Sequence, residues 1–243
     1  MDATIAANLQ SVRSRIYAAA RRAGRDPSDI RLIAVSKTFS AAHVRAAWAA
    51  GQRDFGENKV QEALQKIGET SDIEIRWHLI GHLQSNKAKK SAAGFACIHS
   101  LDSIDLLNKL DAAAAGLDTP PDVLVQVDLA NEATKFGAAT DEARRILDAA
   151  QSARAVRVSG LMLIPPWNED QEQTRPWFRR LRELRESWLR EGVPPASLAQ
   201  LSMGMSHDFE AAIEEGATMV RVGTAIFGKR QFPVASSQFP APN

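Results

Sequence analysis

The sequence predicts an α/β fold, namely a single (β/α)8 barrel of the TIM type with an extra helix at its N-terminus. Eight short β-rich runs are spread along the chain, and several are apolar at successive positions, as in parallel strands that are buried on both faces. The segments between these runs have the spacing of amphipathic helices. The regular alternation of strand and helix favours the barrel, with an open doubly wound sheet and a small second domain as the alternative.

The predicted elements follow one another in a simple order. An amphipathic helix comes first, with Ile5, Leu9, Val12 and Ile16 on one face. The eight β-rich runs then lie at residues 30–36, 52–58, 76–81, 95–100, 122–129, 156–164, 198–204 and 218–223. Apolar residues recur with helical spacing between them, as at Val60, Leu64 and Ile67. Eight strand and helix units within 243 residues match one barrel.

Composition restricts the domain organisation and the class of protein. No linker or change of composition precedes residue 231, so we expect one domain over 1–230 and a flexible tail, rich in Pro and Ser, over 231–243. The formal charge of +1 does not favour nucleic acid, and no apolar run is long enough to span a membrane. Cys97 is the single cysteine, so a reducing compartment and a cytoplasmic location are expected.

The barrel fold predicts where a functional site lies. Active sites of such barrels are built at the C-terminal ends of the strands, and phosphate is often held after the seventh and eighth. The polar residues at the predicted strand ends are Ser36 to Thr38, Gly56 to Asn58, Gly81 and His82, Ser100, Asn131 with Lys135, Ser202 to Ser206, and Arg221 to Thr224. Any chemistry of the protein is therefore expected among these residues.

Lys37 stands at the end of the first predicted strand, in the stretch "LIAVSKTF". A lysine at a barrel mouth becomes a nucleophile toward aldehydes when desolvation and nearby cations lower its pKa. A lysine that extends from the strand end to solvent is the competing interpretation. Position alone does not decide between them.

The end of the predicted barrel supplies candidate phosphate ligands. In "GATMVRVGTAIFG" a strand runs into Gly223 and Thr224, where backbone amides and a hydroxyl can converge on an anion. Ser206 is predicted to be the N-cap of the helix after the seventh strand, which would add a second hydroxyl. Arg221 lies within the eighth strand and, if buried, needs either a carboxylate or a ligand acceptor.

Other motifs carry little weight. "GTAIFGKR" resembles a nucleotide-binding P-loop but has Arg230 where that motif needs Ser or Thr. His78 and His82 are predicted to lie across a strand and its turn rather than on one helix face, so we expect no zinc pair and no metal site. Cys97 reads as an inert thiol in a buried strand.

Five motifs together resemble those of a known family. "AGRDPSDIRLIAVSKT", "FGENKVQEA", "WHLIGHLQSNK", "NEATKFG" and "SMGMSHDFEAAIEEGATMVRVGTAIFG" occur in the order and spacing of the pyridoxal phosphate homeostasis proteins, over roughly residues 4–230. The resemblance implies a barrel like the N-terminal domain of alanine racemase that binds pyridoxal 5′-phosphate (PLP) over residues 1–230 and has no dedicated catalytic turnover.

The resemblance also implies a role for each candidate residue. Lys37 would form the internal aldimine with PLP, and Asn58 would lie beside the ring and its 3-hydroxyl. Arg221 would face the pyridine nitrogen, and the phosphate would be held by Ser206, Gly223 and Thr224. The family often has an aromatic residue where this chain has Lys59, so the resemblance does not carry a ring contact over to that position.

Three functions follow from these expectations. The first is a monomeric PLP carrier in vitamin B6 homeostasis, with PLP as its ligand and apo forms of PLP-dependent enzymes as recipients. The alternative is a PLP-dependent amino-acid racemase, which is less favoured because the related racemases use a second base from an extra domain and this chain ends at Asn243, soon after the eighth strand. A sugar-phosphate aldolase that uses Lys37 without a cofactor is the third.

Overall fold

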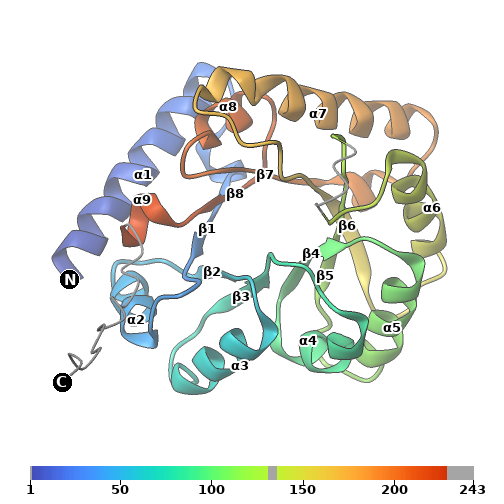
Figure 1. Ribbon diagram of the computed structural model, residues 1–243, viewed down its shortest axis with the longest axis horizontal. Coiled ribbons are helices and arrows are strands. Elements are labelled where there is room, and N and C mark those ends of the chain that lie inside the picture. Colours follow the sequence, from blue (N-terminus) through green and yellow to red (C-terminus); the bar gives the residue numbers. More distant parts are fainter. Residues whose placement is uncertain (1, 131–135, 229–243) are drawn as a thin grey trace, which may run out of the picture.

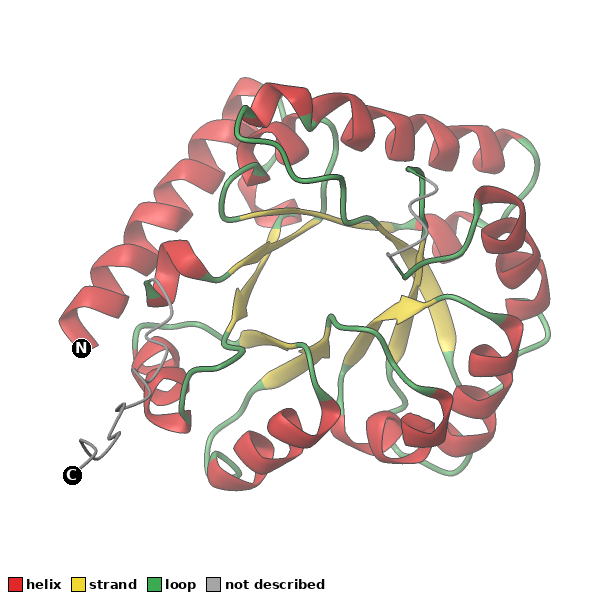
Figure 2. Ribbon diagram, in the orientation of Figure 1, coloured by secondary structure: helices red, strands yellow, loops and turns green. Residues whose placement is uncertain are grey.

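Eight parallel strands form a closed barrel in the order in which they occur along the chain. This computed structural model describes residues 2–130 and 136–228. The strands are β1 (Arg31–Val35), β2 (Asp54–Glu57), β3 (Arg76–Leu79), β4 (Cys97–Leu101), β5 (Asp122–Gln126), β6 (Arg157–Met162), β7 (Gln200–Met205) and β8 (Met219–Val222). Figure 2 shows them as a ring surrounded by helices. The predicted barrel and all eight predicted strands are thereby confirmed.

The helices cover the outside of this ring (Figure 1). They are α1 (Asp2–Arg22), α2 (Ala41–Ala49), α3 (Val60–Glu69), α4 (Ala88–Gly94), α5 (Ile104–Ala114), α6 (Thr140–Ala150), α7 (Arg175–Arg190), α8 (Phe209–Glu214) and α9 (Thr224–Phe227). Within the described residues, no helix has both the length and the apolar character needed to cross a membrane. The expectations for Asn131, Lys135, Arg230 and the tail over 231–243 fall outside the part of the chain that the structure describes.

The predicted N-terminal helix is present as α1 and packs against α2, α8 and α9. Its apolar stripe, including Leu9 and Val12, is buried, which is the main reason that it docks on the barrel. Two polar contacts fix the position of the docked helix. Asn8 donates to the carbonyl of Ile226, and Arg22 pairs with Glu214. The helix therefore covers the wall next to β1 and β8.

The inside of the barrel contains both apolar and polar side chains. An apolar cluster there consists of Ile33, Cys97, Leu124, Met162 and Met219. Residues paired in register on neighbouring parallel strands face the same side of a sheet. Because Arg221 pairs with Ile33, His78 with Cys97, and Ser202 with Met162, these three polar residues also point inward. Each is almost fully buried, so each needs hydrogen-bond partners within the barrel.

A test of the barrel packing compares two glycines. A Cβ atom on Gly160 of β6 would lie 2.0 Å from the carbonyl oxygen of Gln200, whereas one on Gly68 of α3 would meet nothing within 4 Å. We expect Gly160→Ala to lower the free energy of unfolding by about 3 kcal/mol or more, because backbone must move. Gly68→Ala should leave it unchanged or raise it by about 0.5–1 kcal/mol. Urea unfolding curves measure both, and equal midpoints would contradict this packing.

Candidate functional site

The ends of four adjacent strands, in the order β7, β8, β1 and β2, bring the predicted site residues to one rim of the barrel. Ala34 of β1 pairs with Val222 of β8, and Val35 of β1 pairs with Gly56 of β2. Lys37 follows β1 in a half-buried turn, and Asn58 follows β2 directly. The amine and the carboxamide are therefore presented from neighbouring strands beside the end of β8.

The turn that carries Lys37 has a strained backbone. Thr38 has a φ of 70°, a left-handed conformation that is unfavourable for a β-branched residue. The amide of Phe39 donates to the carbonyl of Ser36 at 3.0 Å, which closes the turn. Such strain costs on the order of 1–3 kcal/mol and is concentrated at functional positions. It persists here because the packed ends of β1 and β2 hold the turn in place.

A buried ion pair joins the two strand ends just before Lys37 and Asn58. Glu57 Oε1 accepts from Ser36 Oγ and from Lys66 Nζ, both at 2.6 Å, and Lys66 Nζ also donates to the carbonyl of Ser36 at 2.8 Å. Sequence reasoning did not identify Lys66. Its position three residues after the buried Ala63 on α3 was the available signal, because this spacing puts it on the inward face of the helix.

Asn58 lines a pocket of about 290 Å³ at the barrel mouth. Its other lining residues are Ile80, Gly81, His82, Gln126, Phe136 and Ile164. Asn58 Oδ1 is buried and has no hydrogen-bond partner among the described residues, which suits a ligand that donates a hydrogen bond. A Cβ atom on Gly81 would lie 2.1 Å from the carbonyl oxygen of Asn58, so glycine is what allows this close approach.

The predicted cap at Ser206 is wrong, but the structure gives this residue a different role. The turn after β7 continues as far as Asp208, which is the N-cap position of α8, because the helix begins only at Phe209. Ser206 Oγ instead accepts from the amides of Gly223 at 3.0 Å and Ala225 at 3.4 Å. The loops after β7 and β8 are therefore joined by one hydroxyl.

The loop after β8 lies close to β1. A Cβ atom on Gly223 would lie 3.2 Å from the carbonyl oxygen of Val35, two residues before Lys37. Thr224 begins α9 and is exposed. The candidate phosphate ligands and the candidate lysine thus belong to neighbouring parts of one rim.

Arg221 is buried inside the barrel, and its hydrogen bonds there go to neutral oxygen acceptors rather than to a carboxylate. Its Nη1 donates to Ser202 Oγ at 2.6 Å, and its Nη2 donates to the carbonyl of Leu163 at 2.9 Å. The predicted carboxylate is replaced by neutral acceptors, and Asp208 acts only through its charge. Burial lowers the pKa of Arg221 to about 10, and the charge of Asp208 opposes this change, so the guanidinium stays cationic at neutral pH.

Sequence reasoning considered His78 only beside His82, and missed that His78 and His99 both point into the barrel. His78 and His99 lie 3.0 Å apart between Nδ1 and Nε2, and the candidate ligand atoms of His78, Cys97 and His99 all lie within 4.8 Å of one another. The signal was the strand alternation, which directs both histidines inward from β3 and β4. The thiol of Cys97 fits its predicted inert character, because burial raises its pKa well above the usual range.

His82 is separate from this buried group. It lies at the barrel mouth, where it pairs with Asp102 at 3.3 Å and stacks on Phe136 with ring centres 3.8 Å apart. Burial is the main cause of the raised pKa of Asp102, and the charge of His82 opposes it. His78 and His82 therefore do not form a pair, as predicted from their positions.

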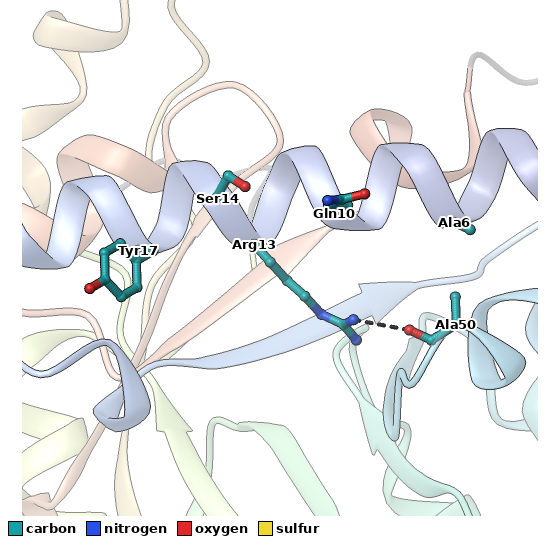
Figure 3. Close-up of a pocket in the computed structure, with 6 residues that line it drawn as sticks. All are labelled: Ala6, Gln10, Arg13, Ser14, Tyr17 and Ala50. Carbon is teal, nitrogen blue, oxygen red and sulfur yellow. Dashed lines mark hydrogen bonds between the residues drawn. The ribbon is translucent and has the colours of Figure 1, made fainter.

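A second pocket, of about 620 Å³, lies on the outer side of α1 (Figure 3). Its lining residues are Ala6, Gln10, Arg13, Ser14, Tyr17 and Ala50. Arg13 reaches across it to donate to the carbonyl of Ala50 at 3.0 Å. None of the predicted site residues lines this pocket, so the barrel mouth remains the candidate site.

Comparison with known proteins shows the family of this chain. A family model described as "Alanine racemase, N-terminal domain" matches residues 7–231. The pyridoxal phosphate homeostasis protein of Pseudomonas aeruginosa is 46% identical over 96% of this chain and 99% of that protein. The one from Aquifex aeolicus is 42% identical over 92% and 97% of the two chains. The chain belongs to the pyridoxal phosphate homeostasis protein family.

Solved structures give the same result for the fold. PipY of Synechococcus elongatus, solved with PLP bound, is 41% identical, with a TM-score of 0.81 over 92% of this chain and all of that one. Alanine racemase of Clostridium difficile is 16% identical, with a TM-score of 0.70 over 95% of this chain and 58% of the racemase. The second comparison concerns the barrel fold alone.

The buried histidines predict a fall in stability at mildly acidic pH. Burial lowers the pKa of His78 and of His99 in the folded protein. Their contribution to the free energy of unfolding is therefore fully present above the pKa of histidine in the unfolded chain, about 6.5, and decreases as the pH falls below that value. Each histidine that stays neutral should cost about 2 kcal/mol of unfolding free energy between pH 7 and pH 5. Asp54 has a lowered pKa, and its contribution decreases only below about pH 4.

The measurement is urea unfolding at several pH values between 5 and 7. His99→Gln should reduce the slope of stability against pH relative to the wild type, because one titrating group is removed. His207→Gln, at an exposed histidine, is the matched control and should keep the wild-type slope. Identical slopes for both variants would show that His99 is not held neutral.

Proposed function

We propose that this protein binds PLP at the barrel mouth and serves PLP (vitamin B6) homeostasis by holding and supplying the cofactor. The observation that carries this proposal is the PLP-bound structure of PipY, at 41% identity over the whole of that chain, together with an arrangement of strand-end residues here that suits the same cofactor. Relatives at 46% and 42% identity are named as PLP homeostasis proteins.

The described residues suit PLP in four places. The Asn58 carboxamide has a buried oxygen with no partner among the described residues, available for the ring hydroxyl. Ser206 and Gly223, held together at 3.0 Å, and the neighbouring Thr224 would bind the phosphate. Arg221 would donate to the pyridine nitrogen. The aldehyde of PLP supplies an electrophilic carbon, to which the Lys37 amine would bond reversibly with loss of one water.

We further propose that the bound PLP is carried rather than used for turnover. PLP catalysis depends on the ring as an electron sink, and an acidic partner at the pyridine nitrogen strengthens that sink. Arg221 is a donor that does not give up its proton at neutral pH, so the nitrogen would remain unprotonated. Lys59 is 75% exposed at its side chain and pairs with Glu62, which supports its having no contact with the ring.

The recipients and the state of the carrier are part of the same proposal. Apo forms of PLP-dependent enzymes are the proposed recipients, and the protein is proposed to act as a cytoplasmic monomer. The single cysteine, Cys97, is buried and is consistent with a reducing compartment.

The covalent site is tested by trapping. Purified protein is mixed with PLP and reduced with borohydride, and the mass of the intact protein and of its peptides is measured. We expect one PLP adduct, located on Lys37, and its loss in Lys37→Ala. Lys59→Ala, which removes a nearby exposed lysine, should keep the adduct. Absence of an adduct, or an adduct on another lysine, would refute the proposed site.

The absence of turnover is tested separately by isotope exchange. The PLP-loaded protein is incubated in deuterium oxide with a panel of amino acids, and exchange at Cα is followed by NMR. A carrier should show no exchange above that of free PLP. Exchange with one amino acid that is lost in Lys37→Ala would favour the racemase alternative. In the trapping experiment, an adduct of Lys37 with an aldehyde other than PLP would favour the aldolase.

A further inference from the structure

A chain of hydrogen bonds crosses the inside of the barrel from Asp54 to Arg221. Asp54 Oδ1 lies 3.0 Å from His78 Nε2, and His78 Nδ1 lies 3.0 Å from His99 Nε2. His99 Nδ1 lies 2.8 Å from Ser202 Oγ, which accepts from Arg221 at 2.6 Å. All five residues are at most 5% exposed and come from five different strands. This hydrogen-bond chain therefore links the N-terminal end of β2 to the proposed cofactor site.

The two ends of the chain force all of its bonds to point the same way. A carboxylate only accepts and a guanidinium only donates. When Asp54 accepts from Nε2 of a neutral His78, Nδ1 of that ring is an acceptor, so His99 must donate from its Nε2. His99 Nδ1 then accepts from the Ser202 hydroxyl, whose oxygen remains free to accept from Arg221. No group along the chain has to play two incompatible roles.

The charge states agree with this direction. Burial is the largest cause of the lowered pKa of His78 and of His99, and it keeps both rings neutral. For Asp54, burial acts to raise the pKa, but the hydrogen bonds from Arg76 and His78 outweigh it and keep the carboxyl ionised. Arg76 holds that carboxylate with two N–H groups, at 2.9 and 2.6 Å. The acceptor end of the chain is thus fixed in place.

We propose that the inside of the barrel provides a set of positioning residues for Arg221, namely Asp54, His78, His99 and Ser202. The chain turns the Ser202 proton toward His99, so the hydroxyl oxygen faces the guanidinium. Together with the carbonyl of Leu163, this gives Arg221 two acceptors at fixed places. Three of the five guanidinium N–H groups remain for an acceptor on a ligand. The role of the chain toward PLP rests on the proposed function, in which Arg221 meets the ring nitrogen.

A buried cation site is the competing interpretation of the same atoms. His78, Cys97 and His99 have candidate ligand atoms within 4.8 Å of one another. A metal would need both facing ring nitrogens as acceptors, whereas the chain makes one of them a donor across 3.0 Å. The raised pKa of the buried Cys97 thiol also disfavours the thiolate that a metal requires. The hydrogen-bond chain accounts for more of the contacts.

The direction of the chain is tested without PLP. Long-range 15N–1H correlation spectra of protein labelled at histidine distinguish the two neutral tautomers from the charged ring. At pH 7 we expect His78 and His99 both to be neutral with the proton on Nε2, with signals assigned through His78→Gln and His99→Gln. A charged ring, or a proton on Nδ1 of either residue, would overturn the chain. So would one equivalent of zinc in the purified protein that disappears in Cys97→Ala.

The positioning role is tested by comparing two buried serines. Ser202→Ala removes the group that joins His99 to Arg221, whereas Ser159→Ala removes a buried hydroxyl that has no partner among the described residues. We expect Ser202→Ala to raise the dissociation constant for PLP by about five- to tenfold and to shift the absorbance maximum of bound PLP, because Arg221 loses a fixed acceptor. Ser159→Ala should change neither quantity.

The outcomes distinguish the existence of the hydrogen-bond chain from its role in positioning Arg221 for PLP. Equal affinities and spectra for Ser202→Ala and Ser159→Ala would refute the positioning role. If the wild-type protein binds no PLP, the proposed function and the positioning role both fail, while the histidine spectra still decide whether the chain exists. A change in the affinity of Ser202→Ala for PLP without a spectral shift would also count against the positioning role, because a merely structural role of Ser202 gives that result.

Discussion

Closing eight parallel strands into one ring is the constraint on which the rest of this structure depends. It puts every C-terminal strand end on the same rim, so Lys37, Asn58, Ser206 and Gly223 become neighbours although they are far apart in the sequence. The same closure encloses an interior that water does not reach. Polar side chains that point into that interior must find partners among themselves, because an unsatisfied buried group costs on the order of 1–3 kcal/mol.

Buried polar side chains of the barrel are paired in two ways. On the outer face of the sheet, which Glu57 shares with Phe55, the carboxylate of Glu57 pairs with Lys66 of α3, and this lysine also bonds to Ser36 directly before the candidate lysine. Deeper in the barrel, neutral rings and a hydroxyl connect a carboxylate to a guanidinium without a further charge between them. Both arrangements place buried polarity beneath the rim, where it orients groups that face the mouth.

Most of the fold could be predicted from the sequence, because strand burial and helix spacing are local patterns. The eight strands and α1 were found in this way, and the position of Lys37 at the end of β1 followed from the barrel alone. Contacts that depend on loop paths could not be found. Ser206 looked like a helix cap, but its hydroxyl bonds to amides from another loop. Nothing in the local sequence of His78 or His99 indicates that they meet each other, since this requires the register between β3 and β4.

The hydroxyl of Ser206 has a consequence for the proposed role of the protein as a PLP carrier. The amides of Gly223 and Ala225 are satisfied by an acceptor that belongs to the protein itself, so the loops after β7 and β8 keep their relative position through an internal bond. Exchange of one acceptor for another at these amides would cost little reorganisation. A reservoir gains from this property, since the shape that receives its cargo does not have to be rebuilt after each delivery.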